Sequence, residues 1–196
     1  MKKQFLIFTV CLLALTQFAS AQDYKFFVGG SVGFETSGNS EVDASRSSFE
    51  ILPYAGYFVS EKMIVGLGLG YSGVKDADDS DNYTSTGLFN INPFARYRTS
   101  PSEKFGLYGE FGLNVGLGNS KIVVGGNDAG TGNTTNIGVY LGPGVDYAIA
   151  DRWVINALWG ALSYNNLSIK DVDGSSSNFA FGLNPRNIRF SLNYMF

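Results

Sequence analysis

The chain has 196 residues, of which 44% are hydrophobic and 16% are charged, with a formal net charge of −3, one Cys and no His. The length fits one domain, and the acidic balance provides no basic surface for nucleic acid. One Cys and no His exclude a Cys/His zinc site and acid–base catalysis by histidine.

The first 21 residues have the three parts of a secretory signal peptide. Lys2 and Lys3 form the positive start, residues 5–15 form an apolar stretch too short to span a bilayer, and Ala-Ser-Ala at 19–21 is a small-residue cleavage site. We therefore expect export and cleavage, leaving a mature domain of residues 22–196 without Cys. An N-terminal membrane anchor formed by the same stretch is the alternative.

The mature chain alternates between apolar and polar residues with a period of two, which indicates strands with one apolar face. Eight such runs occur, at about 24–35, 47–60, 63–73, 84–99, 104–118, 134–149, 153–164 and 186–196. The seventh run is apolar on both faces, so its sidedness stays open. No stretch has the 18 consecutive apolar residues of a transmembrane helix.

The connections between these runs alternate in length. Three are short, at 60–62, 100–103 and 150–152, and four are long and polar, at 36–46, 74–83, 119–133 and 165–185. This pattern predicts an all-β fold, an eight-stranded antiparallel up-and-down transmembrane β-barrel. In such a barrel the short turns face the periplasm and the long loops face outward.

A repeated Pro-x-small-x-Tyr pattern occurs at 53–57, 93–97 and 143–147, each time shortly before a short turn. The three tyrosines should therefore form a ring at one depth, where an amphipathic ring favours the membrane–water interface. The predicted periplasmic aromatic girdle comprises Tyr57, Tyr97, Tyr147, Trp153, Tyr194 and Phe196. A tyrosine ring inside a soluble barrel is the alternative. Because proline cannot donate to a β-ladder, we expect bulges or missing ladder bonds at these prolines.

The face opposite the apolar one is mostly Gly, Ser and Asn, with few charges. Such a face is too poorly charged for a solvated exterior but fits the filled interior of a small barrel. The expected lumen charge network comprises Glu50, Arg96, Glu110, Asp146 and Arg189. We expect Arg96 and Asp146 at the same depth and Glu110 diagonal to Arg96. A structural network of ion pairs is the favoured interpretation, and a gate for small solutes is the alternative.

An acidic segment at 76–81 offers oxygen ligands that could hold Ca²⁺. It does not match an EF-hand, because Asp81 stands where glycine is required and Gly87 where glutamate is required. A solvated loop is therefore favoured, and we expect no metal and no cofactor. Serines lack a histidine base, and the glycine-rich stretches lack a phosphate-loop lysine, so we expect no enzymatic activity.

The signal peptide, the eight runs, the alternation of loop lengths and the ending Ile188-x-Phe190-x-Leu192-x-Tyr194-x-Phe196 together resemble the small OmpA/OmpX-type outer-membrane barrels. The Pro-x-small-x-Tyr hairpins resemble porin-like barrels common in Bacteroidota. The resemblance covers the mature chain. It departs from full-length OmpA-like proteins in one respect, since we expect a barrel alone, without a peptidoglycan-binding domain. The alternating C-terminus resembles the signal that the outer-membrane assembly machinery reads.

These observations predict an integral protein of the bacterial outer membrane, non-enzymatic, which supports membrane integrity or binds other molecules through its loops. A narrow passive, porin-like channel is one alternative. A secreted lipocalin-like binding barrel is another, weakened because the first strand lacks Gly-x-Trp. The expected partners are outer-membrane lipid, lipopolysaccharide and the assembly machinery, with no nucleic acid, and the expected state is a monomer.

Overall fold

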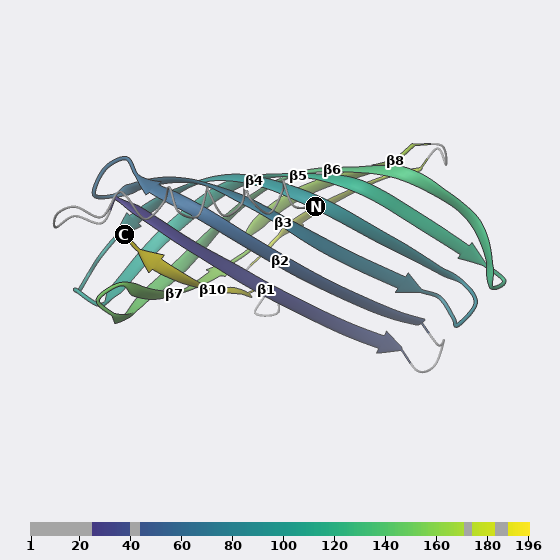
Figure 1. The fold of residues 1–196 in the computed structure, drawn as a ribbon, viewed down its shortest axis with the longest axis horizontal. Helices are drawn as coiled ribbons and strands as arrows, with labels where there is room; N and C mark the ends of the chain where they lie inside the picture. The colour runs from purple at the N-terminus through teal and green to yellow at the C-terminus, as the bar shows by residue number, and fades with distance from the viewer. Residues whose placement is uncertain (1–24, 40–43, 171–173, 183–187) are drawn as a thin grey trace, which may run out of the picture.

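A computed structural model describes residues 25–39, 44–170, 174–182 and 188–196, in which one antiparallel β-sheet is rolled into a barrel (Figure 1). Its strands are β1 (Phe26–Asn39), β2 (Ala44–Phe58), β3 (Met63–Ala77), β4 (Tyr83–Thr99), β5 (Phe105–Val124), β6 (Asn127–Ala150), β7 (Trp153–Trp159), β8 (Leu162–Ile169), β9 (Gly174–Phe181) and β10 (Ile188–Met195). The described residues include no helix long and apolar enough to cross a membrane. The predicted signal peptide lies outside the described residues.

Eight of these strands form a closed ring, which confirms the predicted fold class. Strands β1 to β7 pair in sequence order, and β10 lies between β7 and β1. The β1–β10 ladder runs from Phe27 opposite Met195 to Ser31 opposite Ser191. The turns β2–β3, β4–β5 and β6–β7 lie at the same end as the C-terminus, and the longer hairpins lie at the other end (Figure 1).

The predicted seventh run is divided into β7 and β8 by Gly160 and Ala161. β7 pairs with Gly144–Ala148 of β6, whereas β8 pairs with Thr134–Leu141, and the register changes by one residue between them. The change reverses which residues face the lumen, from even-numbered in β7 to odd-numbered in β8. A single alternation with a period of two therefore cannot describe the whole segment. For this reason the sequence alone did not show which of its residues face the lumen.

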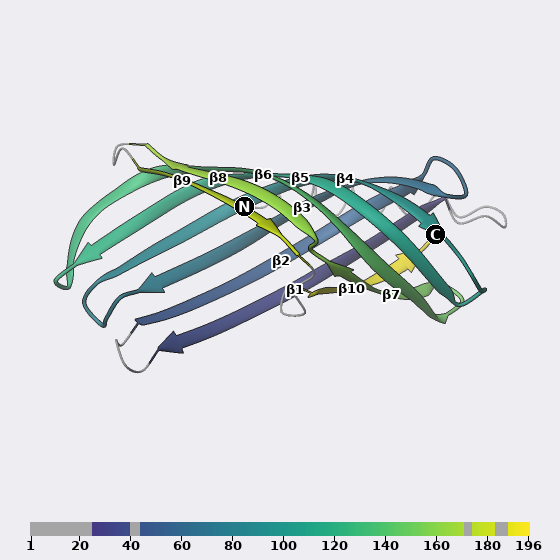
Figure 2. The ribbon, with the colours of Figure 1, turned by 180° about the vertical axis from the view of Figure 1, so that it is seen from behind.

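Two of the predicted long loops prove to be extended strands. The segment 119–133 belongs to a β5–β6 hairpin that closes at Gly125 and Gly126, whose φ angles are +59° and +73°. Two successive positive φ angles favour glycine and match the twist of a two-residue hairpin. Part of 165–185 forms β9, which pairs with β8 behind the barrel as drawn in Figure 1 and in front in Figure 2.

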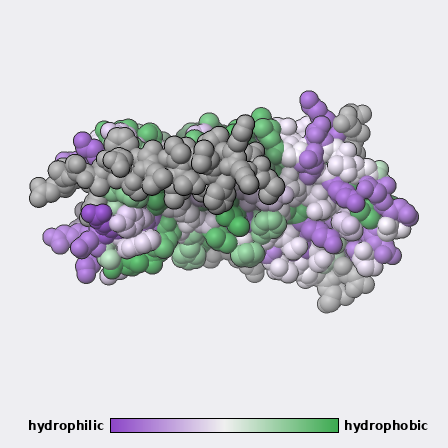
Figure 3. Space-filling model, viewed as in Figure 1, coloured by the Kyte–Doolittle hydropathy of each residue, from purple (hydrophilic) through white to green (hydrophobic). Residues whose placement is uncertain are grey.

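The exterior of the barrel is apolar and the interior polar. In β3 the side chains of Val65, Leu67 and Leu69 point outward and are exposed, whereas the glycines between them line the interior. Arg96 and Glu110, by contrast, are 5% and 4% exposed. Figure 3 shows apolar side chains gathered around the middle of the barrel and polar ones at the end of the long hairpins. This arrangement suits contact with lipid.

The β-ladders are interrupted at all three prolines of the repeat, as predicted. The β2–β3 ladder skips Pro53 and the β4–β5 ladder skips Pro93, with an unchanged register on both sides. Pro143 lies where β6 passes from pairing with β8 to pairing with β7. Each proline also keeps a ladder on its other side, so the barrel stays closed around it.

Candidate functional site in the barrel lumen

A buried ion pair crosses the lumen side of the β4–β5 ladder. Arg96 lies directly opposite Glu110 in the register, rather than diagonally as the sequence suggested. Arg96 Nε and Nη2 donate to Glu110 Oε2 over 2.9 and 2.7 Å. Such a charge-assisted pair keeps two buried ions compensated, and it would be costly to separate them.

Aromatic rings surround the Arg96 guanidinium. Its Cζ lies 4.1 Å from the centroid of the Tyr108 ring, 5.6 Å from that of Phe94 and 6.0 Å from that of Phe27. These distances allow cation–π attraction in addition to the ion pair. Phe27 and Phe94 also form an apolar cluster with Ile64 at this end of the lumen, so the level of Arg96 is filled by rings as well as by charge.

The second oxygen of Glu110 extends the network toward the long-hairpin end of the lumen. The Tyr140 hydroxyl lies 2.9 Å from Glu110 Oε1 and 3.2 Å from Asn92 Oδ1. Because a phenol has one proton, the carboxylate is the stronger acceptor. Asn92 in turn donates through Nδ2 to the Leu113 carbonyl over 2.7 Å. The cluster thereby joins β4, β5 and β6 across the lumen.

The five charged residues expected in one network are divided between three separate pairs. Asp146 binds Arg98 through two hydrogen bonds of 2.7 and 2.8 Å, not Arg96. Glu50 binds Arg189 over 3.2 Å, with both side chains about one-third exposed. Arg98 lies near the end of its predicted run and is not among the five residues of the expected network. One feature of the sequence does indicate that Arg98 faces the lumen. Like Arg96, it is an even-numbered residue of the run 84–99, so both side chains lie on the same face of the strand.

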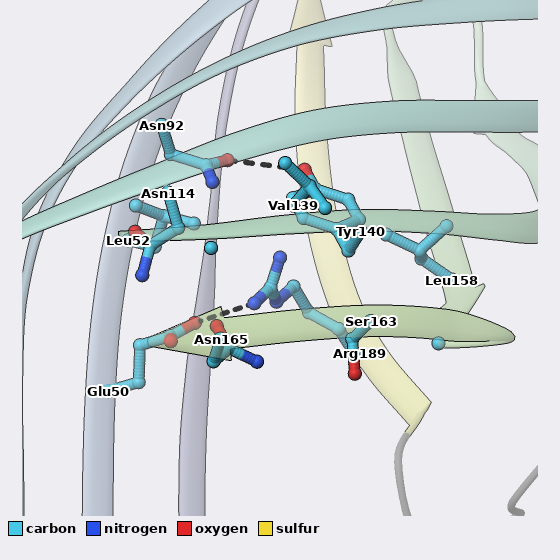
Figure 4. Close-up of a pocket in the computed structure, with 12 residues that line it drawn as sticks. Glu50, Leu52, Asn92, Asn114, Val139, Tyr140, Leu158, Ser163, Asn165 and Arg189 are labelled. Atoms are coloured by element: carbon cyan, nitrogen blue, oxygen red, sulfur yellow. Dashed lines mark hydrogen bonds and ion pairs between the residues drawn. The ribbon is translucent and has the colours of Figure 1, made fainter. Parts of the chain in front are cut away.

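Above the Arg96 level the lumen contains a cavity of about 300 Å³ (Figure 4). Its polar lining comes from Glu50 on β2, Asn114 on β5, Ser163 and Asn165 on β8 and Arg189 on β10. Its other walls include Leu52, Asn92, Val139, Tyr140 and Leu158. Gly138 makes room for the Asn165 side chain, which lies where a Cβ on residue 138 would be. Strand β8 therefore supplies two polar lumen residues that the sequence did not predict, Ser163 from the end of the seventh run and Asn165 from the predicted loop 165–185.

The residues of the predicted aromatic girdle lie near the short-turn end. Tyr57, Tyr97, Tyr147 and Trp153 are exposed on the barrel exterior. The Trp153 and Tyr194 rings are 5.0 Å apart, and the Tyr194 and Phe196 rings 4.9 Å apart. The structure thus places the six residues around one end of the barrel.

The acidic segment at 76–81 is held by its own hydrogen bonds. Asp79 accepts the backbone N–H groups of Asp81 and Asn82 and the Asn82 side-chain amide. These bonds, that of the Asn82 side chain foremost, lower the pKa of the Asp79 carboxyl. Asp76 forms an exposed ion pair with Arg46 on β2. Within the described ranges, no group of three or more metal-ligating side chains occurs.

A closed antiparallel barrel with an apolar exterior and a polar interior defines the class of membrane barrels. The sequence matches the outer membrane protein beta-barrel domain family over residues 6–196, so the chain belongs to that family. This membership sets aside the secreted lipocalin-like barrel. No curated protein matches the sequence.

Solved structures of bacterial outer-membrane barrels share the fold. Neisserial surface protein A is 18% identical, with a TM-score of 0.50, covering 87% of this chain and 97% of that one. A major outer membrane protein of Thermus thermophilus is 14% identical, with a TM-score of 0.53, covering 89% and 100%. Outer membrane protein W of E. coli is 15% identical, with a TM-score of 0.51, covering 90% and 100%.

Proposed function

We propose that this protein is a non-enzymatic, non-conducting barrel of the bacterial outer membrane that presents its long hairpins at the cell surface. The observation that carries the proposal is the Arg96–Glu110 layer, in which an ion pair, the Tyr140 hydroxyl and three aromatic rings fill the lumen. The cavity at this level has a volume of only about 20 Å³, room for roughly one water molecule. A continuous water path would have to displace these side chains.

The long hairpins support a role at the surface. A transmembrane strand needs about 9–11 residues, whereas β5 has 20 and β6 has 24. About half of each strand therefore extends beyond the membrane, where the exposed Lys121–Asp128 ion pair joins β5 to β6. The exposed Arg46–Asp76 ion pair joins β2 to β3. An extended polar sheet of this kind offers a surface for binding other molecules. The aromatic girdle then lies at the periplasmic boundary, in contact with lipid.

The absence of histidine supports the non-enzymatic assignment, because the serines have no base of suitable pKa to activate them. The apolar exterior supports contact with outer-membrane lipid and lipopolysaccharide. The alternating apolar residues of β10 support recognition by the outer-membrane assembly machinery.

A narrow channel is the second candidate. The cavity above the Arg96 layer and the partly exposed Glu50–Arg189 pair favour it, because water could reach this part of the lumen. The two functions differ in one property, the permeability of the layer formed by Arg96 and Glu110.

Conductance across a planar lipid bilayer tests this property. We expect the refolded wild-type protein to conduct no more than the protein-free bilayer. The double variant Arg96→Ala/Glu110→Ala removes both charges, so it leaves neither unpaired, and it should open discrete conductance steps. The double variant Lys121→Ala/Asp128→Ala removes an exposed pair of the outer hairpin and serves as the control. Steady conductance by the wild type would contradict the blocked lumen and favour the channel.

A further inference from the structure

The upper lumen cavity contains polar side chains without protein partners. Asn114, Ser163 and Asn165 line it, and their side chains form no hydrogen bond with any other described residue. Solvent reaches these polar atoms, because among the described residues the fully buried side-chain polar atoms without a partner are Ser31 Oγ and Tyr108 Oη. Figure 4 shows these amides in the same space as the Glu50–Arg189 pair. The lumen therefore offers a set of unused donors and acceptors.

We propose that this cavity binds a small neutral molecule rich in hydroxyl groups, of about the size of one sugar ring. The volume of about 300 Å³ lies at the lower limit of small-molecule sites. The cavity ends at the layer of Tyr140, Glu110 and Arg96, where the pocket has a volume of only about 20 Å³. A ligand could therefore enter from the long-hairpin end and stay, but could not pass through.

The chemistry of the lining favours hydroxyl groups. Each asparagine amide presents two donors and one acceptor in a plane, which matches two neighbouring hydroxyls of a ring. Arg189 uses Nη2 and Glu50 uses Oε1 for their 3.2 Å contact. The remaining guanidinium N–H groups and the second carboxylate oxygen are left to bind hydroxyls as donors and acceptors.

The charge of the lining favours a neutral ligand. Among the described residues, Glu50 and Arg189 are the only charged ones that line the cavity, and they compensate each other. An anion or a cation beside this pair would bring in a net charge that no further charged residue of the described lining compensates. A zwitterion would have to compete with the contact that the two charges make with each other.

The cavity also has apolar surface, which suits the C–H face of a ring. Leu52 and Leu158 line it, and both are buried. A molecule with hydroxyls on its edge and C–H groups on its face would therefore contact both parts of the lining. The Glu50 and Arg189 side chains are 35% and 36% exposed, so the polar part of the cavity is reached by solvent.

Titration with D-glucose, followed by nuclear magnetic resonance of the Asn114 and Asn165 side-chain amides, tests the proposal. The protein is refolded in detergent micelles, and heat-modifiable gel mobility checks the fold of each variant. We expect saturable shifts of both amides with glucose. Asn165→Leu should weaken binding about tenfold, equivalent to the loss of roughly 1.4 kcal/mol, and Asn114→Leu should act in the same direction.

The matched control is Asn166→Leu, on the same strand but on the outer face, where Asn166 donates to Ser177 Oγ. This variant should bind glucose as the wild type does. L-Glutamine, a zwitterion of similar size, should bind more weakly than glucose. Three results would each overturn the proposal: no saturable shift with glucose, tighter binding of glutamine, or equal loss in the Asn165 and Asn166 variants. Conductance is measured separately, so failure of this site and failure of the blocked lumen are distinguishable.

Discussion

The Asn92 side chain replaces a hydrogen bond that Pro93 cannot form. The register on either side, Ile91 opposite Val115 and Phe94 opposite Gly112, places Pro93 opposite Leu113. A proline nitrogen has no proton to give to the Leu113 carbonyl. Asn92 Nδ2 donates to that carbonyl over 2.7 Å instead. The proline is therefore tolerated inside a closed barrel because its own neighbour in the chain satisfies the orphaned acceptor.

This relationship predicts that the effects of the two residues on stability are coupled. Asn92→Leu should lower the free energy of unfolding by about 1–3 kcal/mol, because it leaves the carbonyl of Leu113 without a partner. Adding Pro93→Ala supplies a backbone N–H and should recover a substantial part of the loss. Urea-induced unfolding from lipid vesicles measures both. Strictly additive effects would show that Asn92 does not serve the Leu113 carbonyl.

The buried Arg96–Glu110 pair predicts a large asymmetry between single and double substitutions. Arg96→Leu should destabilise the barrel by about 3–5 kcal/mol, since Glu110 is left buried and uncompensated. Arg96→Leu/Glu110→Leu should be markedly more stable than that single variant. Arg46→Leu removes one partner of an exposed pair and should cost at most about 1 kcal/mol. The same urea unfolding measurement would reject the argument if the double variant were the least stable of the three.

The sequence predicted the features that follow from strict alternation. Neighbouring residues of a regular strand, such as Gly66 and Leu67 of β3, lie on opposite faces. The ring of eight strands and the apolar exterior could therefore be predicted from the alternation in the sequence. The proline interruptions were also predictable, because the missing N–H is a property of the residue itself. Both predictions needed only local chemistry.

Features that depend on pairing between distant segments were not predictable. The hairpin around Gly125 has its apolar residues in one run, at 122–124, and is otherwise mostly polar, so it carries no apolar alternation. It forms strands because its two segments pair with each other. The one-residue change at Gly160 and Ala161 cancels the period across the seventh run. Arg98 reaches Asp146 over Gly106, where the carboxylate occupies the space that a Cβ would take. The contact between Arg98 and Asp146 therefore depends on the missing side chain of Gly106 on the strand between them.

The β3–β4 turn should lose order at acidic pH. Hydrogen bonds from the Asn82 side chain and from backbone N–H groups lower the pKa of Asp79 below its ordinary value of 3.8. Since the folded pKa is depressed, the stabilisation is present at neutral pH and is lost as the pH falls through that lowered value. The amide resonances of Asp81 and Asn82, followed during an acid titration, should move together with protonation of Asp79. In Asp79→Asn this titration should disappear, and its persistence would assign the transition to another group.

The proposed orientation predicts which end of the barrel reagents reach from outside the cell. The mature chain is expected to contain no Cys, so a single introduced Cys reports its own position. Asn127→Cys lies next to the β5–β6 turn and Glu103→Cys lies in the short β4–β5 turn; both residues are exposed. A membrane-impermeant maleimide added to intact cells should label only the Cys at 127, whereas both should react after lysis, which controls for reactivity. Labelling of only the Cys at 103 on intact cells would reverse the orientation, and it would place the aromatic girdle of Tyr97 and Tyr147 at the outer surface instead.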